Sequence, residues 1–138
     1  MPQRILLAVD DSKHARKAAD VVERLAKDTG AEVSVIHIHE IAVGRWGRLR
    51  VDDNNGDEFA KTIVRELTDA GVPAKLLSRE SYLREVAQAI VAAADEIDAD
   101  LIAVGSRGHS DVHSLALGSV SHKVLHITDR PILVVPAA

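Results

Sequence analysis

Residues 101–125 read "LIAVGSRGHSDVHSLALGSVSHKVL", and within this stretch one structural pattern gives way to another. The stretch opens with an aliphatic run that is typical of a buried strand and closes with apolar residues at helical spacing. Three glycines, Gly105, Gly108 and Gly118, mark the change from one pattern to the other. Glycine is used where the backbone takes a positive φ or lets another group come close. We therefore expect a ligand to sit between this strand and this helix.

Outside this stretch the chain repeats the same alternation of strand and helix. Short apolar runs predict strands at residues 4–10, 31–39, 72–80, 100–105 and 132–136. Apolar residues at helical spacing predict helices at residues 12–29, 57–70, 83–97 and 118–127. Strands joined by helical crossovers form a parallel sheet that helices cover on both faces. The sequence therefore predicts an α/β fold, an open twisted five-stranded parallel sheet in one domain over residues 1–138.

Composition excludes several classes of protein. The 138 residues are 46% hydrophobic and carry a net charge of −4, which suits a globular domain and argues against a nucleic-acid partner. Because no cysteine is present, disulfides and thiolate metal sites are excluded. The first apolar run, Ile5 to Val9, is too short for a signal peptide, and no stretch is long enough for a membrane span. We expect a cytoplasmic protein.

The ends of two predicted strands point to a phosphate site. In open parallel sheets, ligands bind outside the carboxyl ends of the strands, where the strand order reverses. The first strand ends in "AVDDS" at residues 8–12 and the fourth in "AVGSRG" at residues 103–108, and a doubly wound sheet places them side by side. Backbone amides between Gly105 and Gly108, and at the start of the helix after Gly118, would then face a polyphosphate.

Charged side chains at these strand ends have two interpretations each. Asp10 ends a buried strand, where its carboxylate would accept hydrogen bonds from ribose or adenine, or lie near a metal bound to the phosphates. The alternative is that Asp10 caps the first helix with Ser12, which is the role expected for Asp11. Arg107 lies inside the glycine turn, where it either pairs with phosphate or faces solvent. The residues favour the ligand role for Asp10 and leave Arg107 open.

The glycine spacing resembles a known family motif. "GSRG" at residues 105–108, nine further residues and then "GS" at residues 118–119 fit the pattern G-x2-G-x9-G-S/T of the universal stress protein family. "ILLAVDDS", "VIHIHE" and the closing "RPILVVP" are similar to that family as well, so the similarity covers nearly the whole chain apart from residues 42–57. The resemblance implies a Rossmann-like sheet with strand order 3-2-1-4-5, and ATP binding in members that retain the glycine motif.

The resemblance also assigns contacts to particular residues of this chain. Adenine and ribose would lie near Val9, Asp10, Ile38 and Val104. The phosphates, with Mg²⁺ or Mn²⁺ bound through them, would meet Gly105, Arg107, Gly108, Gly118, Ser119, Val120 and Ser121. The resemblance implies a homodimer paired through the uncharged last strand, Ile132, Leu133, Val134 and Val135. An edge strand without charged residues readily pairs with a strand of another chain.

Three positions depart from the family pattern near the expected site. His109 replaces a residue that is often apolar, and Asp111 replaces a glycine and adds negative charge near the phosphates. Arg84 replaces a glycine before the third helix, so the rim near Ser81 and Tyr82 is expected to differ from that of other members. We expect these changes to weaken binding or alter the preference for a base.

Other ligand and catalytic motifs have little support. Neither GxxxxGK[ST] nor GxGxxG occurs. His122 and His126 have the spacing of two metal ligands on one helical face, but no third ligand is evident. His37 and His39 alternate along a strand and face the same side, which favours a hydrogen-bonded core or rim role over catalysis. No G-x-S-x-G elbow marks a nucleophile, which argues against a hydrolase, and we assign no catalytic residue.

The connection from Glu40 to Gly56 is longer than is usual between a strand and a helix. We interpret it as a mobile or functional loop. It contains Trp46, which either covers nearby apolar surface, the interpretation we favour, or closes over a nucleotide or a partner.

Three functions stay open at this point. The first is a regulatory ATP-binding module whose nucleotide occupancy modulates an unknown protein partner or the dimer surface. The second is a slow Mg-dependent ATPase, whose turnover would be weak because no general base is evident beside the γ-phosphate. The third is a dimeric interaction module with an empty or cyclic-nucleotide-binding pocket. The resemblance favours the first.

Overall fold

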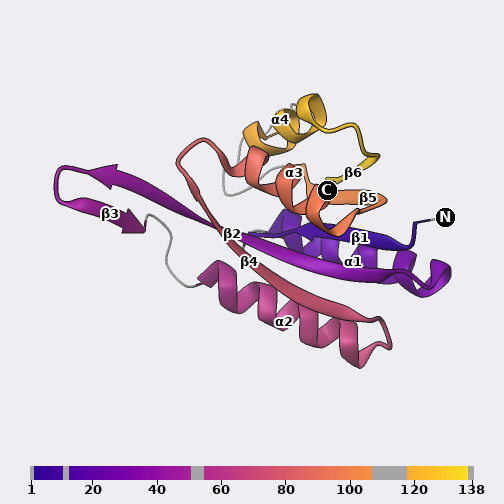
Figure 1. Ribbon diagram of the computed structural model, residues 1–138. Helices are drawn as coiled ribbons and strands as arrows, with labels where there is room; N and C mark the ends of the chain where they lie inside the picture. The colour runs from indigo at the N-terminus through magenta and orange to yellow at the C-terminus, as the bar shows by residue number, and fades with distance from the viewer. Residues whose placement is uncertain (1, 11–12, 51–54, 107–117, 137–138) are drawn as a thin grey trace.

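The computed structural model describes residues 2–10, 13–50, 55–106 and 118–136 (Figure 1). Its elements follow one another as β1 (Arg4–Ala8), α1 (Lys13–Thr29), β2 (Glu32–Gly44), β3 (Gly47–Arg50), α2 (Asn55–Asp69), β4 (Ala74–Tyr82), α3 (Val86–Ile97), β5 (Leu101–Gly105), α4 (Ser119–Ile127) and β6 (Ile132–Val135). No helix within the described ranges is long and apolar enough to cross a membrane.

Five strands form a parallel sheet in the predicted order. β1 pairs with β2 on one side and with β5 on the other, β2 pairs with β4, and β5 pairs with β6. The order β4-β2-β1-β5-β6 is therefore 3-2-1-4-5 when these five strands are numbered along the chain. The order reverses between β1 and β5. The crevice that such folds use for ligands lies at the carboxyl ends of these two strands.

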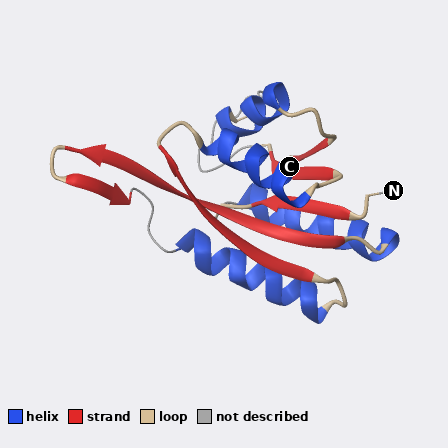
Figure 2. Ribbon diagram, viewed as in Figure 1, coloured by secondary structure: helices blue, strands red, loops and turns tan. Residues whose placement is uncertain are grey.

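Helices cover both faces of the sheet (Figure 2). α1 and α2 pack on the face that carries Leu7 and Val35, while α3 and α4 pack on the face that carries Leu6 and Ile36. Because β1 is central in the sheet, its successive side chains enter the two cores in turn, and Leu6 and Leu7 are both fully buried. This explains why the first strand is a continuous aliphatic run.

The long connection after the second strand is a β-hairpin along most of its length, not the loop that the sequence predicts. β2 continues to Gly44, and β3 pairs with it in antiparallel fashion, with Gly44 opposite Gly47. Gly47 has a φ of 111°, which favours glycine, so the chain can reverse within a tight turn. Trp46 lies in this turn with 94% of its surface exposed, so the interpretation that it covers apolar surface is wrong. The hairpin projects away from the body of the molecule (Figure 1).

Candidate functional site

A cavity of about 360 Å³ opens at the carboxyl ends of β1 and β5, where the strand order reverses. Every predicted site residue that the structure describes lines this cavity, namely Val9, Asp10, Ile38, Val104, Gly105, Gly118, Ser119, Val120 and Ser121. Arg107 and Gly108, which complete the predicted set, lie outside the described residues, and so do His109 and Asp111. The described members of the predicted set therefore come together in one cavity, although they belong to or adjoin four different elements, β1, β2, β5 and α4.

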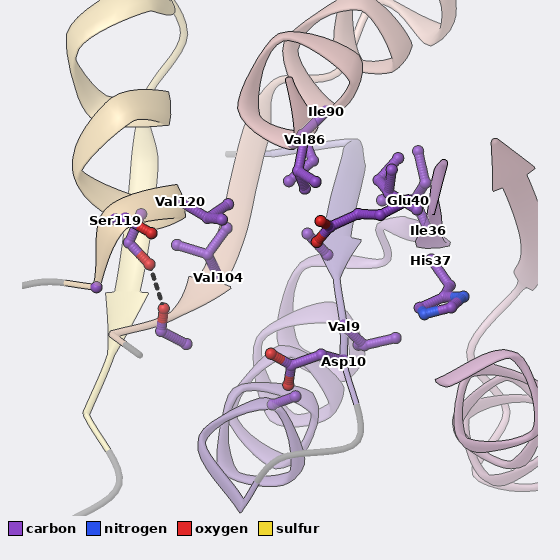
Figure 3. Close-up of a pocket in the computed structure, with 16 residues that line it drawn as sticks. Val9, Asp10, Ile36, His37, Glu40, Val86, Ile90, Val104, Ser119 and Val120 are labelled. Atoms are coloured by element: carbon purple, nitrogen blue, oxygen red, sulfur yellow. Dashed lines mark hydrogen bonds between the residues drawn. The ribbon is translucent and has the colours of Figure 1, made fainter. Parts of the chain in front are cut away.

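One side of the cavity is apolar. Ile36 and Ile38 on β2 and Val104 on β5 are buried, with Val104 only 3% exposed. Val86 and Ile90 on the first turns of α3 point toward the same space (Figure 3). A flat ring placed here would be held by burial of apolar surface, the favourable term that does not depend on direction.

The other side is formed by the amino end of α4. Gly118 precedes the helix in an extended conformation, and among the residues that the structure describes no side chain caps the helix. The amide of Gly118 donates a hydrogen bond of 2.6 Å to the carbonyl of Ser106, which ties the start of α4 to the end of β5. The amides of Ser119, Val120 and Ser121 have no acceptor within the helix, because they belong to its first turn. Such amides and the positive end of the helix dipole favour an anion.

Ser121 holds this arrangement together. Its side chain is buried, and its hydroxyl donates a hydrogen bond to the carbonyl of Gly105 (dashed line in Figure 3). The first turn of α4 is therefore fastened to the last residue of β5. Because the hydroxyl is engaged within the protein, the phosphate contact predicted for Ser121 would fall to its backbone amide.

Two carboxylates also line the cavity. Asp10 follows β1 and lies close to Val9, whereas the Glu40 side chain reaches from β2 toward Val86 (Figure 3). Each carboxylate can accept hydrogen bonds from hydroxyl or amino groups of a ligand. Each would also repel an anionic ligand. The cavity therefore combines anion-binding amides at one end with negative charge along its length.

Glu40 and His37 line the cavity although the sequence does not mark them as site residues. Side chains alternate between the two faces of a strand, so Ile36, Ile38 and Glu40 share the face that α3 covers. Glu40 is the first charged residue in this series. The alternation of side chains along the strand could have identified Glu40 as a cavity residue. That inference requires β2 to continue past residue 39, as it does in the structure.

Four of the histidines fall into two pairs, of which the sequence suggests only His122 and His126 as metal ligands. His122 and His126 meet on the exposed side of α4 with their Nε2 atoms 3.2 Å apart, and among the described residues no third ligand joins them. His37 and His39 are 6% and 3% exposed, and the Nε2 atom of His39 lies 3.1 Å from the hydroxyl of Ser78. The second pair thus occupies the core, as the strand pattern predicts.

Comparisons with known proteins agree over nearly the full length of the chain. A model of the universal stress protein family matches residues 1–136. Universal stress protein YxiE of Bacillus subtilis is 33% identical over 98% of this chain and 99% of its own length. A universal stress protein of Thermus aquaticus, named for the 3′ region of the QAH/OAS sulfhydrylase, is 34% identical over 98% of this chain and 99% of its own length.

Solved structures show the same fold. A universal stress protein from Archaeoglobus fulgidus in complex with dAMP has a TM-score of 0.71 at 23% identity, covering 96% of this chain and 97% of that one. A universal stress protein in complex with cAMP has a TM-score of 0.65 at 23% identity, covering 99% and 98% of the two chains. The fold, the glycine motif and the match over residues 1–136 lead to one conclusion: the chain belongs to the universal stress protein family.

Proposed function

We propose that this protein binds an adenine nucleotide, ATP in the first place, and that nucleotide occupancy modulates a protein partner or the dimer surface. The observation that carries the proposal is the pairing of two environments in one cavity: an apolar wall formed by β2, β5 and the start of α3, and amides in the first turn of α4 that have no acceptor within the helix. A nucleotide needs both environments, because its base is flat and largely apolar while its phosphates are anionic.

The ligand would lie across the cavity in one orientation. Adenine would pack against Val9, Ile38 and Val104, the ribose would meet Asp10, and the phosphates would accept hydrogen bonds from the amides of residues 119–121. A hydrogen bond to a charged group contributes about 1.5–3 kcal/mol net. Three such bonds would supply most of the roughly 8 kcal/mol that corresponds to micromolar affinity.

The fold and the size of the cavity support this ligand class. Two proteins of the same fold were solved with dAMP and with cAMP. The cavity volume of about 360 Å³ lies within the range of about 300–1,000 Å³ that is usual for small-molecule sites.

A divalent cation fits the charges of this site. Asp10 and Glu40 both line the cavity, and a bound polyphosphate would add further negative charge. Mg²⁺ or Mn²⁺ bound through the phosphates would supply charge neutralisation, and the carboxylate of Asp10 is of the oxygen-ligand type that such ions prefer. We therefore expect ATP affinity to depend on the cation more steeply than AMP affinity does.

Hydrolysis of ATP would at most be slow. The described residues that would surround the phosphates, Ser119, Val120 and Ser121, offer amides and hydroxyls but no general base. Glu40 would lie beside the base or the ribose rather than beside the phosphates, since it reaches toward Val86 (Figure 3). A binding role accounts for the site better than an enzymatic role does.

A cyclic nucleotide is the second candidate ligand. The observation that favours it is the presence of Asp10 and Glu40 in the cavity, because a nucleotide with a single negative charge is repelled less by these carboxylates than ATP is. A protein of the same fold was solved with cAMP.

The quaternary structure that we propose is a homodimer paired through β6. This strand ends the sheet, and its residues Ile132–Val135 carry no charge that would guard the edge. A second copy of the chain could add its own β6 to this edge. A cytoplasmic location, where adenine nucleotides are abundant, completes the proposal.

The test is a calorimetric titration of nucleotide-stripped protein with ATP, ADP, AMP and cAMP, each with and without Mg²⁺, followed by an assay of released phosphate. Micromolar ATP binding with negligible phosphate release would support the ATP-binding module. Tighter binding of cAMP than of ATP would favour the second candidate, and rapid phosphate release would replace the binding role with an enzymatic one. Absence of binding by all four nucleotides would overturn the proposal.

A further inference from the structure

A second cluster of polar side chains lies on the other face of β2, between the sheet and α2. His37 and His39 enter this layer from the strand, and Asp57 enters it from the first turn of the helix. Both histidines are buried and Asp57 is partly buried. One ligand atom from each of the three lies within 4.8 Å of the other two. Two imidazoles and one carboxylate thus converge from two elements.

The distances in this cluster suit a metal ion. Nε2 of His39 lies 3.5 Å from Oδ1 of Asp57. Two ligands of a tetrahedral zinc ion are separated by about 3.4 Å, given bonds of about 2.0–2.1 Å. The rings of His37 and His39 meet edge to face with their centroids 4.6 Å apart, so both imidazoles border the same small volume.

The hydrogen bonding of Asp57 independently supports a cation in this cluster. Its Oδ1 atom is buried and accepts no hydrogen bond from the described residues. A buried carboxylate oxygen without a donor is costly, and nearly all such atoms in proteins have a partner. A cation bound between Asp57 and His39 would supply this partner.

Gly56 brings the helix close enough for the cluster to form. A Cβ atom at this position would lie 2.0 Å from Nε2 of His37, so only glycine allows α2 to approach the ring this closely. The next residue in the chain is Asp57. The same close approach therefore sets the carboxylate beside the imidazoles.

We propose that His37, His39 and Asp57 form a site for a divalent transition metal ion of the zinc class, with water at the fourth position. Two histidines and a carboxylate are a ligand set that zinc uses in proteins, and they suit it better than Mg²⁺ or Ca²⁺, which prefer oxygen ligands. The ion fastens the start of α2 to β2. Because His37 also lines the nucleotide cavity, the ion fixes one wall of that cavity.

One neighbouring charge opposes the cation. Nζ of Lys61 lies 3.8 Å from Oδ2 of Asp57, but half of the lysine side chain is exposed, so it can turn toward solvent. We expect Lys61→Gln to raise the metal affinity several-fold. A cluster that only packs the core would show no such response.

The experiment uses the untagged chain, freed of metal and nucleotide, and titrates it with Co²⁺ while the visible spectrum is recorded, and with Zn²⁺ in a calorimeter. The expected result is one Co²⁺ per chain with the intense absorption of a four-coordinate ion, displaced by Zn²⁺. Asp57→Asn, which keeps the shape of the side chain, should weaken Zn²⁺ binding by more than the ~10–100-fold that loss of an outer partner costs. His126→Ala, which breaks the exposed pair on α4, should leave the strong site unchanged.

Thermal unfolding provides a second readout that depends neither on the visible spectrum nor on calorimetry. Zn²⁺ in excess should raise the midpoint of unfolding of the wild-type chain and of His126→Ala, but not that of Asp57→Asn, because a ligand that binds only the folded state stabilises it. Absence of Zn²⁺ and Co²⁺ binding, or binding that His126→Ala removes and Asp57→Asn leaves intact, would overturn the proposal. Since no nucleotide is present, the result is independent of the function proposed above.

Discussion

A single residue before α3 holds a conformation that its side chain disfavours. Arg84 has a φ of 69°, in the left-handed region, and its carbonyl accepts a hydrogen bond from Lys123 on α4. Residues other than glycine, asparagine and aspartate rarely adopt this region, which costs roughly 1–2 kcal/mol for other side chains. A glycine at this position would remove the strain, because glycine adopts a positive φ without steric cost.

Replacement of Arg84 should therefore raise stability. We expect Arg84→Asn to increase the free energy of unfolding by about 0.5–1 kcal/mol, because asparagine tolerates the left-handed region without the added flexibility of glycine in the unfolded chain. Urea unfolding followed by circular dichroism measures the change. Arg84→Ala serves as the control, since it removes the charge and keeps the strain, and it should not be stabilising. Equal stabilisation by both variants would show that charge rather than backbone strain is responsible.

Asp100 joins the amino ends of β1 and β5. Its carboxylate accepts hydrogen bonds from the amides of Gln3 and Arg4, at 2.8 and 2.9 Å, and these bonds lower the pKa of Asp100 below its ordinary value. Since the ionised form is favoured in the folded state, its contribution to stability is present above about pH 4 and lost as the pH falls through the lowered pKa.

We expect Asp100→Asn to unfold at a lower urea concentration than the wild-type chain at neutral pH. The difference between their unfolding midpoints should become smaller as the pH is lowered below about 4. Unfolding midpoints measured between acid and neutral pH test this. A gap that stays constant with pH would mean that the carboxylate charge is not what stabilises this junction.

At the scale of elements, the amino end of α4 carries the proposed phosphate contacts through its backbone. Proline is tolerated at the first position of a helix, where it removes one amide and leaves the helix intact. Gly118 has φ −64° and ψ 162°, which is the conformation that a residue before proline prefers. The structure therefore allows one backbone donor to be deleted from Ser119 without disturbing the fold.

Ser119→Pro should weaken ATP binding by about 10–100-fold, the equivalent of one hydrogen bond to a charged group. Adenosine binding should be unchanged, because adenosine has no phosphate to contact α4. Ser119→Ala, which keeps the amide, should retain most of the affinity for ATP. Calorimetric titration of the three proteins with ATP and with adenosine makes the comparison, and equal loss in both variants would point to the hydroxyl instead.

The alternation of strand and helix could be predicted from the sequence, but the ends of elements could not. The helix predicted from residue 83 begins at Val86, because Arg84 interrupts it with a positive φ. The strand predicted to end at residue 39 continues to Gly44, because β3 folds back and pairs with it. Both differences depend on backbone geometry or pairing that the local pattern of apolar residues does not encode.

At the scale of the whole molecule, the sheet order explains why part of the site is visible in the sequence. Asp10 and Gly105 each end an aliphatic run, so the motif and the strand ends could be predicted to meet. Asp57 could not be placed beside His39 in this way, because their contact depends on how closely α2 approaches β2. Contacts between residues at the ends of neighbouring strands can be predicted from the strand order. Contacts that depend on how closely a helix packs against the sheet cannot be predicted in this way.

The open edge of the sheet leads to a prediction about assembly. The carbonyls of Pro131 and Val135 accept hydrogen bonds from the amides of Ile102 on β5 and of Ser106 just after it, so the alternate amide at Val134 faces away from β5. We expect Val134→Pro to keep the fold while removing a donor that a second β6 would need. Sedimentation should show a dimer for the wild-type chain and a monomer for the variant at the same concentration. A dimer in both would place the interface elsewhere.

The most direct measurement is a crystal structure of the protein grown with ATP and Mg²⁺. We expect adenine to pack against Val9, Ile38 and Val104, with the phosphates on the amides of residues 119–121. A nucleotide bound outside this cavity, or bound within it with its phosphates directed away from α4, would contradict the assignment of the site.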